Sequence, residues 1–256
     1  MGIDSADYDN DGWPDIVKTN FSDDTNNLFH NDHGIMFTDR SGPADFGPIS
    51  IPFLGFGVKF LDLDNDGWKD VFVANGHVNP QVDQRSFGVT YAERPLLFRN
   101  LGNGKFEEIG TRVDSPMSHR YVARGAATAD LFNDGREDLI VSVLDGSPLV
   151  LRNTSLRSGH WLRIKTIGVV SNRDGFGAKV QVKAGGLTQE AEVRANSSFE
   201  SASDPRLHFG LGSASQVDSI VILWPSGTVD RIGTQLADQQ LTVEEGKGLI
   251  GVRRSE

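Results

Sequence analysis

The feature that most constrains this chain is a nine-residue acidic motif that occurs three times. It reads D-x-D-N-D-G-x-x-D at residues 7–15 and again at 62–70. A third copy at residues 130–138 keeps the pattern except at its third position, where Phe132 replaces Asp. In each copy a Gly lies five residues before the first Asp, and an apolar run follows the last Asp. Motifs that recur in one register indicate a repeat architecture.

A second shared element follows each acidic motif and ends in Asn. It reads Leu-Phe-His-Asn at 28–31, Leu-Phe-Arg-Asn at 97–100 and Val-Leu-Arg-Asn at 150–153. It begins 21 residues after the first Asp in the first copy, 35 in the second and 20 in the third, so the second copy carries an insertion, within 75–93. Each repeat therefore predicts strand, acidic turn, strand, strand, Gly turn and strand, which is the composition of a four-stranded propeller blade.

The amino-acid sequence after the third repeat has a different pattern. Residues 161–166 and 178–183 alternate apolar and polar side chains, and short strand-like runs recur between Gly-rich turns. We therefore expect an all-β chain with almost no helix. Residues 1–155 should form about three blades of a partial β-propeller, and residues 156–256 a small β-sandwich-like domain.

Charge and composition exclude several classes of function. The chain has 35 acidic and 25 basic residues, a formal net charge of −10, which disfavours binding to nucleic-acid phosphates. It has no cysteine, which excludes disulfides and Cys-ligated zinc. No apolar run approaches the ~18 residues of a membrane-spanning helix, so no transmembrane segment is expected.

The acidic motif has the chemistry of a calcium loop. Alternating carboxylates can converge inside a tight turn, Gly12 permits the backbone reversal, and Asn10 suits a left-handed conformation. Calcium takes 6–8 oxygen ligands, whereas magnesium requires a stricter octahedron. The loop is not an EF-hand, because its twelfth position is Lys18, Val73 or Val141 rather than Glu. The predicted Ca²⁺ ligands are Asp7, Asp9, Asp11, Asp15 and the Trp13 carbonyl, and in the second loop Asp62, Asp64, Asp66, Asp70 and the Trp68 carbonyl.

The third loop is a weaker candidate. Its ligands would be Asp130, Asp134 and Asp138, but Phe132 removes one carboxylate and brings an apolar ring into the turn. The sequence leaves two alternatives open, a weak metal site and a turn retained for its geometry alone.

These repeats resemble FG-GAP/VCBS blades of the integrin-α-like β-propeller. The sequence segments at residues 75–83, 95–104, 123–127 and 144–148 are similar to those of the cartilage acidic protein family and its bacterial relatives. The sequence segments at residues 171–179, 203–212 and 224–227 resemble the ASPIC/UnbV domain. The resemblance implies about seven blades in the family's propeller, and this chain opens inside a blade. We therefore expect an N-terminal truncation that has also removed a signal peptide.

The resemblance implies a calcium-stabilised protein of the extracellular space, periplasm or cell surface. Because no catalytic constellation is recognisable, the main hypothesis is a non-enzymatic module for adhesion or for binding a protein or glycan. Two alternatives remain: a polysaccharide-active propeller enzyme with its site in the 75–93 insertion, and a purely structural scaffold. The ligand and the oligomeric state are not determined by the sequence, although the exposed edges of a partial propeller favour association with another chain.

Overall fold

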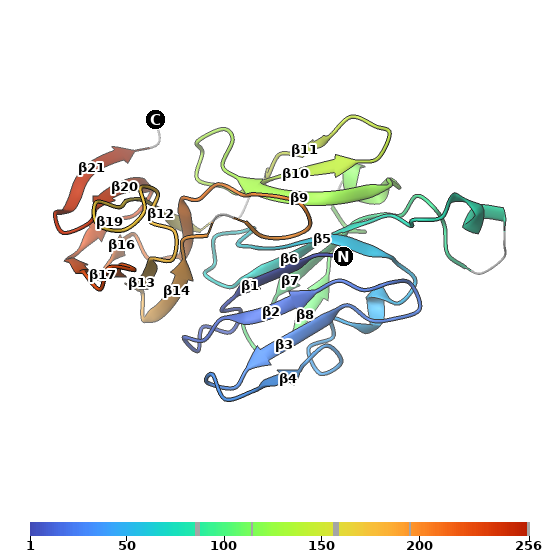
Figure 1. Ribbon diagram of the computed structural model, residues 1–256, viewed down its shortest axis with the longest axis horizontal. Helices are drawn as coiled ribbons and strands as arrows, with labels where there is room; N and C mark the ends of the chain where they lie inside the picture. Colours follow the sequence, from blue (N-terminus) through green and yellow to red (C-terminus); the bar gives the residue numbers. More distant parts are fainter. Residues whose placement is uncertain (85–87, 114, 156–158, 195, 255–256) are drawn as a thin grey trace.

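The structure of the protein is a computed structural model that describes residues 1–84, 88–113, 115–155, 159–194 and 196–254 (Figure 1). Within these residues the only helices are three 3-10 helices, η1 (Pro48–Ser50), η2 (Pro80–Gln84) and η3 (Ser115–Ser118). The expectation of an all-β chain is therefore confirmed. Residues 85–87 of the predicted insertion, and 156–158 beside the predicted domain boundary, lie outside the described residues.

Three antiparallel sheets follow one another along the chain and correspond to the three repeats. In Figure 1 they lie one above another, with blade 1 at the bottom and blade 3 at the top. Blade 1 consists of β1 (Ile3–Ala6), β2 (Asp15–Lys18), β3 (Asn27–Asn31) and β4 (Phe37–Asp39). Blade 2 consists of β5 (Gly55–Leu61), β6 (Asp70–Asn75), β7 (Leu96–Asn100) and β8 (Phe106–Glu108). Blade 3 consists of β9 (Ala123–Ala129), β10 (Asp138–Val143) and β11 (Leu149–Leu151).

Within the described residues, blade 3 has three strands where four were expected of a blade. The reason is visible in the sequence, because the third repeat lacks the Gly turn that leads to the fourth strand in the other two. After Asn153 the chain instead continues toward the C-terminal strands.

The C-terminal part forms two four-stranded sheets and one two-stranded sheet. Together with the blades they make five sheets of three or four strands, two more than the repeats alone predict. In the first sheet β12 pairs with β20 in parallel, a connection that the alternating pattern did not reveal. The strands of this sheet, in order, are β15 (Leu207–Gly212), β12 (His160–Ile167), β20 (Gln239–Glu244) and β21 (Gly248–Arg254). The second holds β14 (Leu187–Glu192), β13 (Lys179–Ala184), β17 (Ser219–Leu223) and β18 (Val229–Ile232), and the small one β16 (Gln216–Val217) and β19 (Gln235–Leu236).

Side-chain burial explains the strand sequences. Strand β6 of the middle blade is buried at every position, and its residues 71–74 form a continuous apolar run because neighbouring blades cover both of its faces. Strand β2 of blade 1 alternates between buried and half-buried positions, because only one of its faces is covered. One apolar cluster joins blades 1 and 2, and another joins blades 2 and 3.

A third apolar cluster fills the space between the two large C-terminal sheets. Its fully buried members all lie between residues 162 and 243, and β12, β13, β17 and β20 each contribute two of them. This arrangement is a β-sandwich core. The exact division of the chain at 155/156 stays a prediction.

The segment after β14 ties the C-terminal part to the blades. The Ser198 amide donates to the Ile3 carbonyl (2.9 Å), and the Asp204 amide donates to the Thr128 carbonyl (3.0 Å). Ser198 also contacts blade 2, because its Oγ accepts a hydrogen bond from the Val58 amide (3.0 Å). Residues 198–204 therefore run across β1, β5 and β9, the first strand of each blade.

Candidate metal centre

The first Asp of each acidic loop holds the turn together through both carboxylate oxygens. Asp7 Oδ1 accepts the Asp11 amide (3.0 Å), and Asp7 Oδ2 accepts the Gly12 amide (2.8 Å). The other loops repeat these two bonds at 2.8–3.1 Å, from Asp66 and Gly67 to Asp62 and from Asp134 and Gly135 to Asp130. This carboxylate is therefore part of the turn whether or not a metal is bound.

The ninth Asp joins the loop to the third strand of its own blade. Asp15 Oδ2 accepts the Tyr8 amide (3.1 Å), and its Oδ1 accepts the amide of Asn31 at the end of β3 (2.8 Å). The same pair of bonds recurs at 2.7–3.0 Å around Asp70, with Leu63 and Asn100, and around Asp138, with Leu131 and Asn153. The Asn of the second sequence element is thus the loop's hydrogen-bond partner.

The Asn inside each of the first two loops connects neighbouring blades. Asn10 has φ 58°, as predicted, and its Nδ2 donates to the Gly67 carbonyl of the second loop (3.0 Å). Asn65 has φ 56° and donates to the Gly135 carbonyl of the third loop (3.0 Å). These two bonds tie the first loop to the second and the second loop to the third.

The third position of the motif lies outside this scaffold. Asp9 Oδ1 and Asp64 Oδ1 are buried and accept no hydrogen bond. Oxygen atoms of Asp7, Asp9 and Asp15 gather within 4.8 Å of one another. Oxygen atoms of Asp62, Asp64 and Asp66 do the same in the second loop. A buried carboxylate oxygen without a partner is costly, and clustered carboxylate oxygens are the kind of ligand set that could hold a hard cation.

The pKa values of these carboxyl groups show that their charged forms are unfavourable without a nearby cation. Burial raises the pKa of Asp7 to about 6 and that of Asp15 to about 7, despite the backbone amides that favour the charged forms. In the second loop burial raises the pKa of Asp62 to about 7 and that of Asp66 to about 6. Several anions in one small, partly dehydrated loop are stabilised only by a nearby positive charge.

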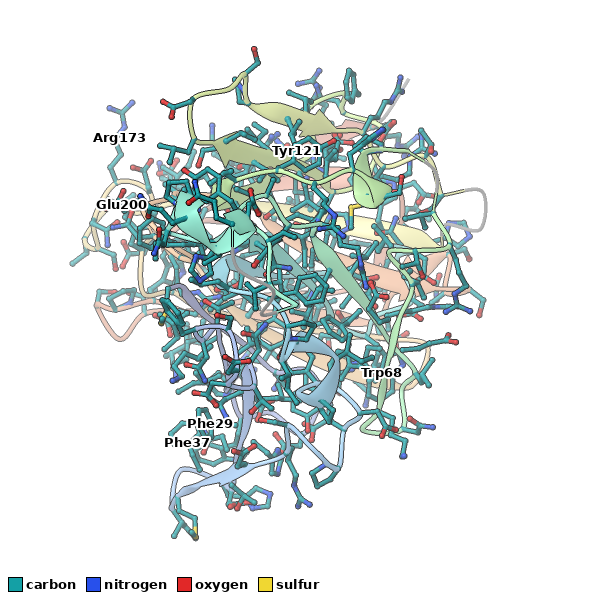
Figure 2. All side chains as sticks on the ribbon, turned by 90° about the vertical axis from the view of Figure 1, so that its right-hand side faces the viewer. Phe29, Phe37, Trp68, Tyr121, Arg173 and Glu200 are labelled. Carbon is teal, nitrogen blue, oxygen red and sulfur yellow. The ribbon has the colours of Figure 1, made fainter. Side chains whose placement is uncertain are left out.

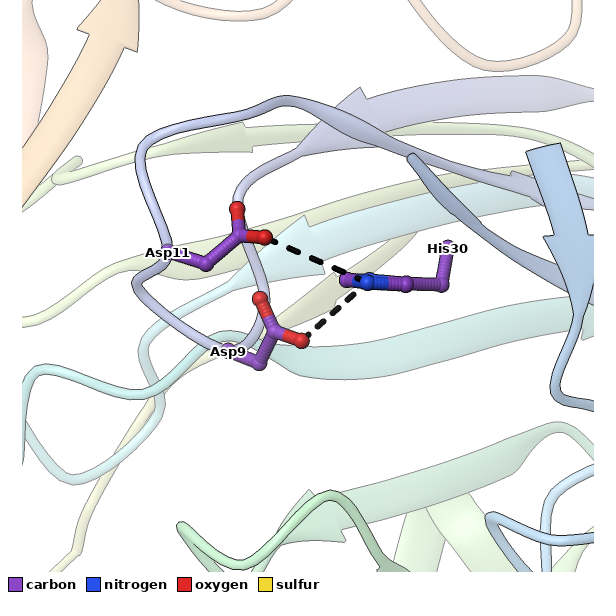
Figure 3. A group of neighbouring side chains, drawn as sticks. All are labelled: Asp9, Asp11 and His30. Atoms are coloured by element: carbon purple, nitrogen blue, oxygen red, sulfur yellow. Dashed lines mark ion pairs between the residues drawn. The ribbon is translucent and has the colours of Figure 1, made fainter. Parts of the chain in front are cut away.

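Each loop also receives a basic side chain that the motif analysis missed. His30 Nδ1 lies 3.3 Å from Asp9 Oδ2, and Nε2 lies 3.9 Å from Asp11 Oδ2; Figure 3 shows the ring facing both carboxylates. In the second loop Arg99 Nη2 lies 2.7 Å from Asp64 Oδ2. The signal was available in the sequence, because both residues directly precede the Asn of the second shared element.

The third loop is neutralised by arginines. The buried guanidinium of Arg163, on β12, pairs with Asp130. Asp134 Oδ2 lies 2.7 Å from Arg136 Nη2 and 3.3 Å from Arg152 Nη2. These bonds lower the pKa of Asp134, the Arg136 hydrogen bond most strongly. The loop places Asp130, Asp134 and Asp138 on the same scaffold as the other loops, but its charge is already balanced by the protein.

The predicted insertion ends at a buried acid. Glu93 is 2% exposed, and one of its carboxyl oxygens accepts the Leu54 amide (2.8 Å). Burial raises the pKa of Glu93 to about 8, so the group is largely protonated at neutral pH. Its backbone pairs with Tyr121 through two hydrogen bonds (2.8 and 2.9 Å). Glu93 thus fastens the base of the insertion to its surroundings and is shielded from any large substrate.

Two comparisons identify the kinds of domain present. A family model described as an FG-GAP-like repeat matches residues 7–73, and a model described as ASPIC and UnbV matches residues 168–250. No curated protein matches the chain significantly. Among the helices of the described residues, none has the length and apolar character needed to span a bilayer.

Proposed function

The chain is an FG-GAP repeat protein with a C-terminal UnbV domain, and from this premise we propose a calcium-stabilised, non-enzymatic interaction module. Domains of these two kinds are generally non-catalytic, and FG-GAP repeats are typical of extracellular or cell-surface proteins. The combination fits an interaction module of the extracellular type. Calcium, adhesion and the choice between protein and glycan partners belong to the proposal.

The observation that carries the calcium proposal is the pair of unpartnered oxygens, Asp9 Oδ1 and Asp64 Oδ1. The scaffold bonds of the first and ninth aspartates fold each loop, and they leave Oδ1 of the third-position carboxylate without a hydrogen-bond donor. We assign one ion to Asp7, Asp9, Asp11 and Asp15 with the Trp13 carbonyl, and a second to Asp62, Asp64, Asp66 and Asp70 with the Trp68 carbonyl. The all-oxygen set favours Ca²⁺ over transition metals.

Bound calcium would stabilise the blades and would take no part in a chemical reaction. The loops hydrogen-bond to one another through Asn10 and Asn65, so an ion that fixes one loop also fixes the contact with the next blade. A short surface loop of this kind suits an affinity of about 10⁻⁴–10⁻³ M. Such sites are empty at cytosolic calcium and filled outside the cell, which supports an exported protein.

Thermal unfolding with calcium or with a chelator tests the metal sites. At a calcium concentration 100 times the dissociation constant, one site contributes about 2.7 kcal/mol. That corresponds to about 5–10 °C in a chain of this size. We expect Asp9→Asn and Asp64→Asn each to lose about half of the calcium-dependent increase, and the double variant to lose all of it. Asp134→Asn, in the third loop, is the matched control and should keep the full increase.

Two outcomes would refute the calcium assignment. One is a wild-type protein whose melting temperature does not respond to calcium. The other is a double variant that responds as strongly as the wild type. An equal response to magnesium would instead show that the loops bind divalent cations without the proposed preference.

The interaction role is tested with a panel of polysaccharides and immobilised extracellular proteins. The proposal expects binding without release of reducing ends. Release of reducing ends would favour a polysaccharide-active enzyme with its site in the 75–93 insertion. Binding to neither class would leave a structural scaffold.

A further inference from the structure

The β3–β4 hairpin of blade 1 brings two histidines and an aspartate beside the first acidic loop. His30 lies on β3, and Asp32 and His33 lie in the turn that leads to β4. Figure 2 labels Phe29 and Phe37, which mark these two strands at the lower margin of the molecule. None of the two histidines and the turn aspartate belongs to the proposed calcium ligands, so their role is a separate question.

His30 presents its two ring nitrogens to different carboxylates. Nδ1 is buried without a hydrogen-bond partner and lies 3.2 Å from Asp15 Oδ1. Nε2 lies 3.9 Å from Asp11 Oδ2, the pair drawn in Figure 3, and 3.6 Å from Asp32 Oδ1. In metal sites the ring nitrogen that does not hold the ion commonly faces a carboxylate or carbonyl, which orients the imidazole. Nε2 is therefore placed as a metal ligand, with Asp15 behind the ring.

The carboxylates of Asp11 and Asp32 are each held through one oxygen. Asp11 Oδ1 accepts the Trp13 amide (2.8 Å), and Asp32 Oδ2 accepts the hydroxyl of Thr38. The remaining oxygens, Asp11 Oδ2 and Asp32 Oδ1, are the ones that face His30 Nε2. Ligating carboxylates in metal sites are commonly oriented by such additional hydrogen bonds.

His33 supplies a second ring nitrogen. Its Nε2 lies 3.9 Å from Asp11 Oδ2, and its ring packs edge-on against Trp13. In a tetrahedral zinc site neighbouring ligand atoms are about 3.4 Å apart, because each lies about 2.1 Å from the ion. The three separations of 3.6, 3.9 and 3.9 Å exceed that spacing by only about 0.2–0.5 Å. The His33 side chain is 68% exposed and has room to turn toward an ion.

The other two repeats build the same turn without these residues. The equivalents of His30, Asp32 and His33 are Arg, Leu and Gly at 99, 101 and 102, and Arg, Thr and Ser at 152, 154 and 155. Both of those loops keep the hydrogen bonds of the ninth aspartate, so the scaffold does not require the histidines. Among the described residues, the carboxylates around the first loop have only imidazoles within ion-pair distance, whereas arginines face the other two loops. An imidazole nitrogen can bind a metal ion, and a guanidinium cannot.

We propose that His30 Nε2, His33 Nε2, Asp11 Oδ2 and Asp32 Oδ1 bind one Zn²⁺ ion beside the first acidic loop. The two carboxylates balance the charge of the ion, and the two imidazoles favour zinc over calcium, which takes oxygen ligands. The ion ties the β3–β4 turn to the loop. Only Asp11 is shared with the proposed calcium ligands, so the inference does not rest on the calcium proposal.

Calorimetric titration of the full chain with Zn²⁺ tests the site. The titration is made without calcium and again with millimolar calcium, and we expect one zinc ion per chain in both. His30→Gln, His33→Gln and Asp32→Asn each remove one ligand, and each should lower the zinc affinity at least about tenfold. Thr38→Val keeps all four ligands but removes the hydroxyl that orients Asp32, so it should lower the affinity by a smaller factor.

The matched control is His160→Gln on β12. His160 also faces a carboxylate, with Nδ1 2.7 Å from Asp238 Oδ2, but it lies in the C-terminal part, and its variant should keep the wild-type zinc affinity. His33→Gln and Asp32→Asn should also keep the calcium-dependent increase in melting temperature. The zinc and calcium proposals can therefore fail independently of each other.

Three outcomes would overturn the zinc site. They are a wild type that binds no zinc, ligand variants that bind zinc as tightly as the wild type, and zinc binding that millimolar calcium abolishes. The last would show that zinc only replaces calcium inside the loop. Circular dichroism of each variant separates lost binding from lost folding, and the turn variants at residues 32 and 33 should fold because the other repeats have different residues there.

Discussion

In the first acidic loop Asp7 and Asp15 accept backbone amides, and in the third loop Asp130 and Asp138 accept the equivalent amides at nearly the same distances. The difference lies in what faces these carboxylates. The first loop adds a third-position Asp with a buried, unpartnered oxygen, whereas the third loop has Phe132 there and receives Arg163 from the C-terminal part. The same turn therefore either leaves a third-position carboxylate oxygen without a partner or has its charge met by an arginine of the protein.

The comparison separates two roles that one motif combines. The first and ninth aspartates are retained in all three loops because they satisfy backbone amides and hold the turn. Oδ1 of the third-position Asp is unpartnered in both of the first two loops, so this position can change without losing the turn. Phe132 replaces it without disturbing the scaffold, and Arg152 lies 4.2 Å from the centre of its ring.

The largest expected effect comes from removing the protein's own cation. Arg163→Met removes the ion-pair partner of the buried Asp130, and breaking a buried ion pair on one side typically costs about 3–5 kcal/mol. Chemical denaturation should show this loss equally with calcium and with chelator. Arg152→Met is the control, because Arg152 is about half exposed and its pairing should contribute at most about 1 kcal/mol. A calcium-dependent rescue of Arg163→Met would show that the third loop binds metal once its arginine is gone.

A smaller difference is expected at the loop glycine. Gly12 has φ 91° and an added Cβ meets no atom within 4 Å, so Gly12→Ala should cost only the left-handed backbone strain, about 1–2 kcal/mol. At Gly135, with φ 82°, the same Cβ would lie 1.9 Å from Nε1 of the buried Trp161. Gly135→Ala should therefore destabilise the protein clearly more than Gly12→Ala in the same denaturation experiment. Equal losses would mean that the third loop is not docked on the C-terminal part as described.

A gradual effect is expected from pH. The raised pKa values of Asp7, Asp15, Asp62 and Asp66 mean that the folded, metal-free protein holds protons more tightly than the unfolded chain. The stability contributed by their protonated forms is present below about pH 4 and is lost as the pH rises through about 6–7. Calcium competes with these protons, so the calcium-dependent increase in melting temperature should grow from pH 5 to pH 8. The opposite trend would contradict the proposed ligands.

Much of the fold follows from local pattern. The three acidic motifs and their spacing place the turns of the blades, and the left-handed conformation of Asn10 follows from its position in the motif. The missing Gly turn after Asn153 accounts for finding only three strands among the described residues of blade 3. The parallel pairing of β12 with β20 was not predictable in this way, because it joins segments about 75 residues apart in the chain.

For the candidate site, the sequence by itself determined the turn, its carboxylates and the substitution at Phe132, because a hydrogen bond between residues four or five positions apart depends on local order alone. Only the tertiary structure decided which basic groups neutralise the carboxylates of each loop. Asp130 and Arg163 are 33 residues apart, and they meet because the C-terminal sandwich packs on the third loop.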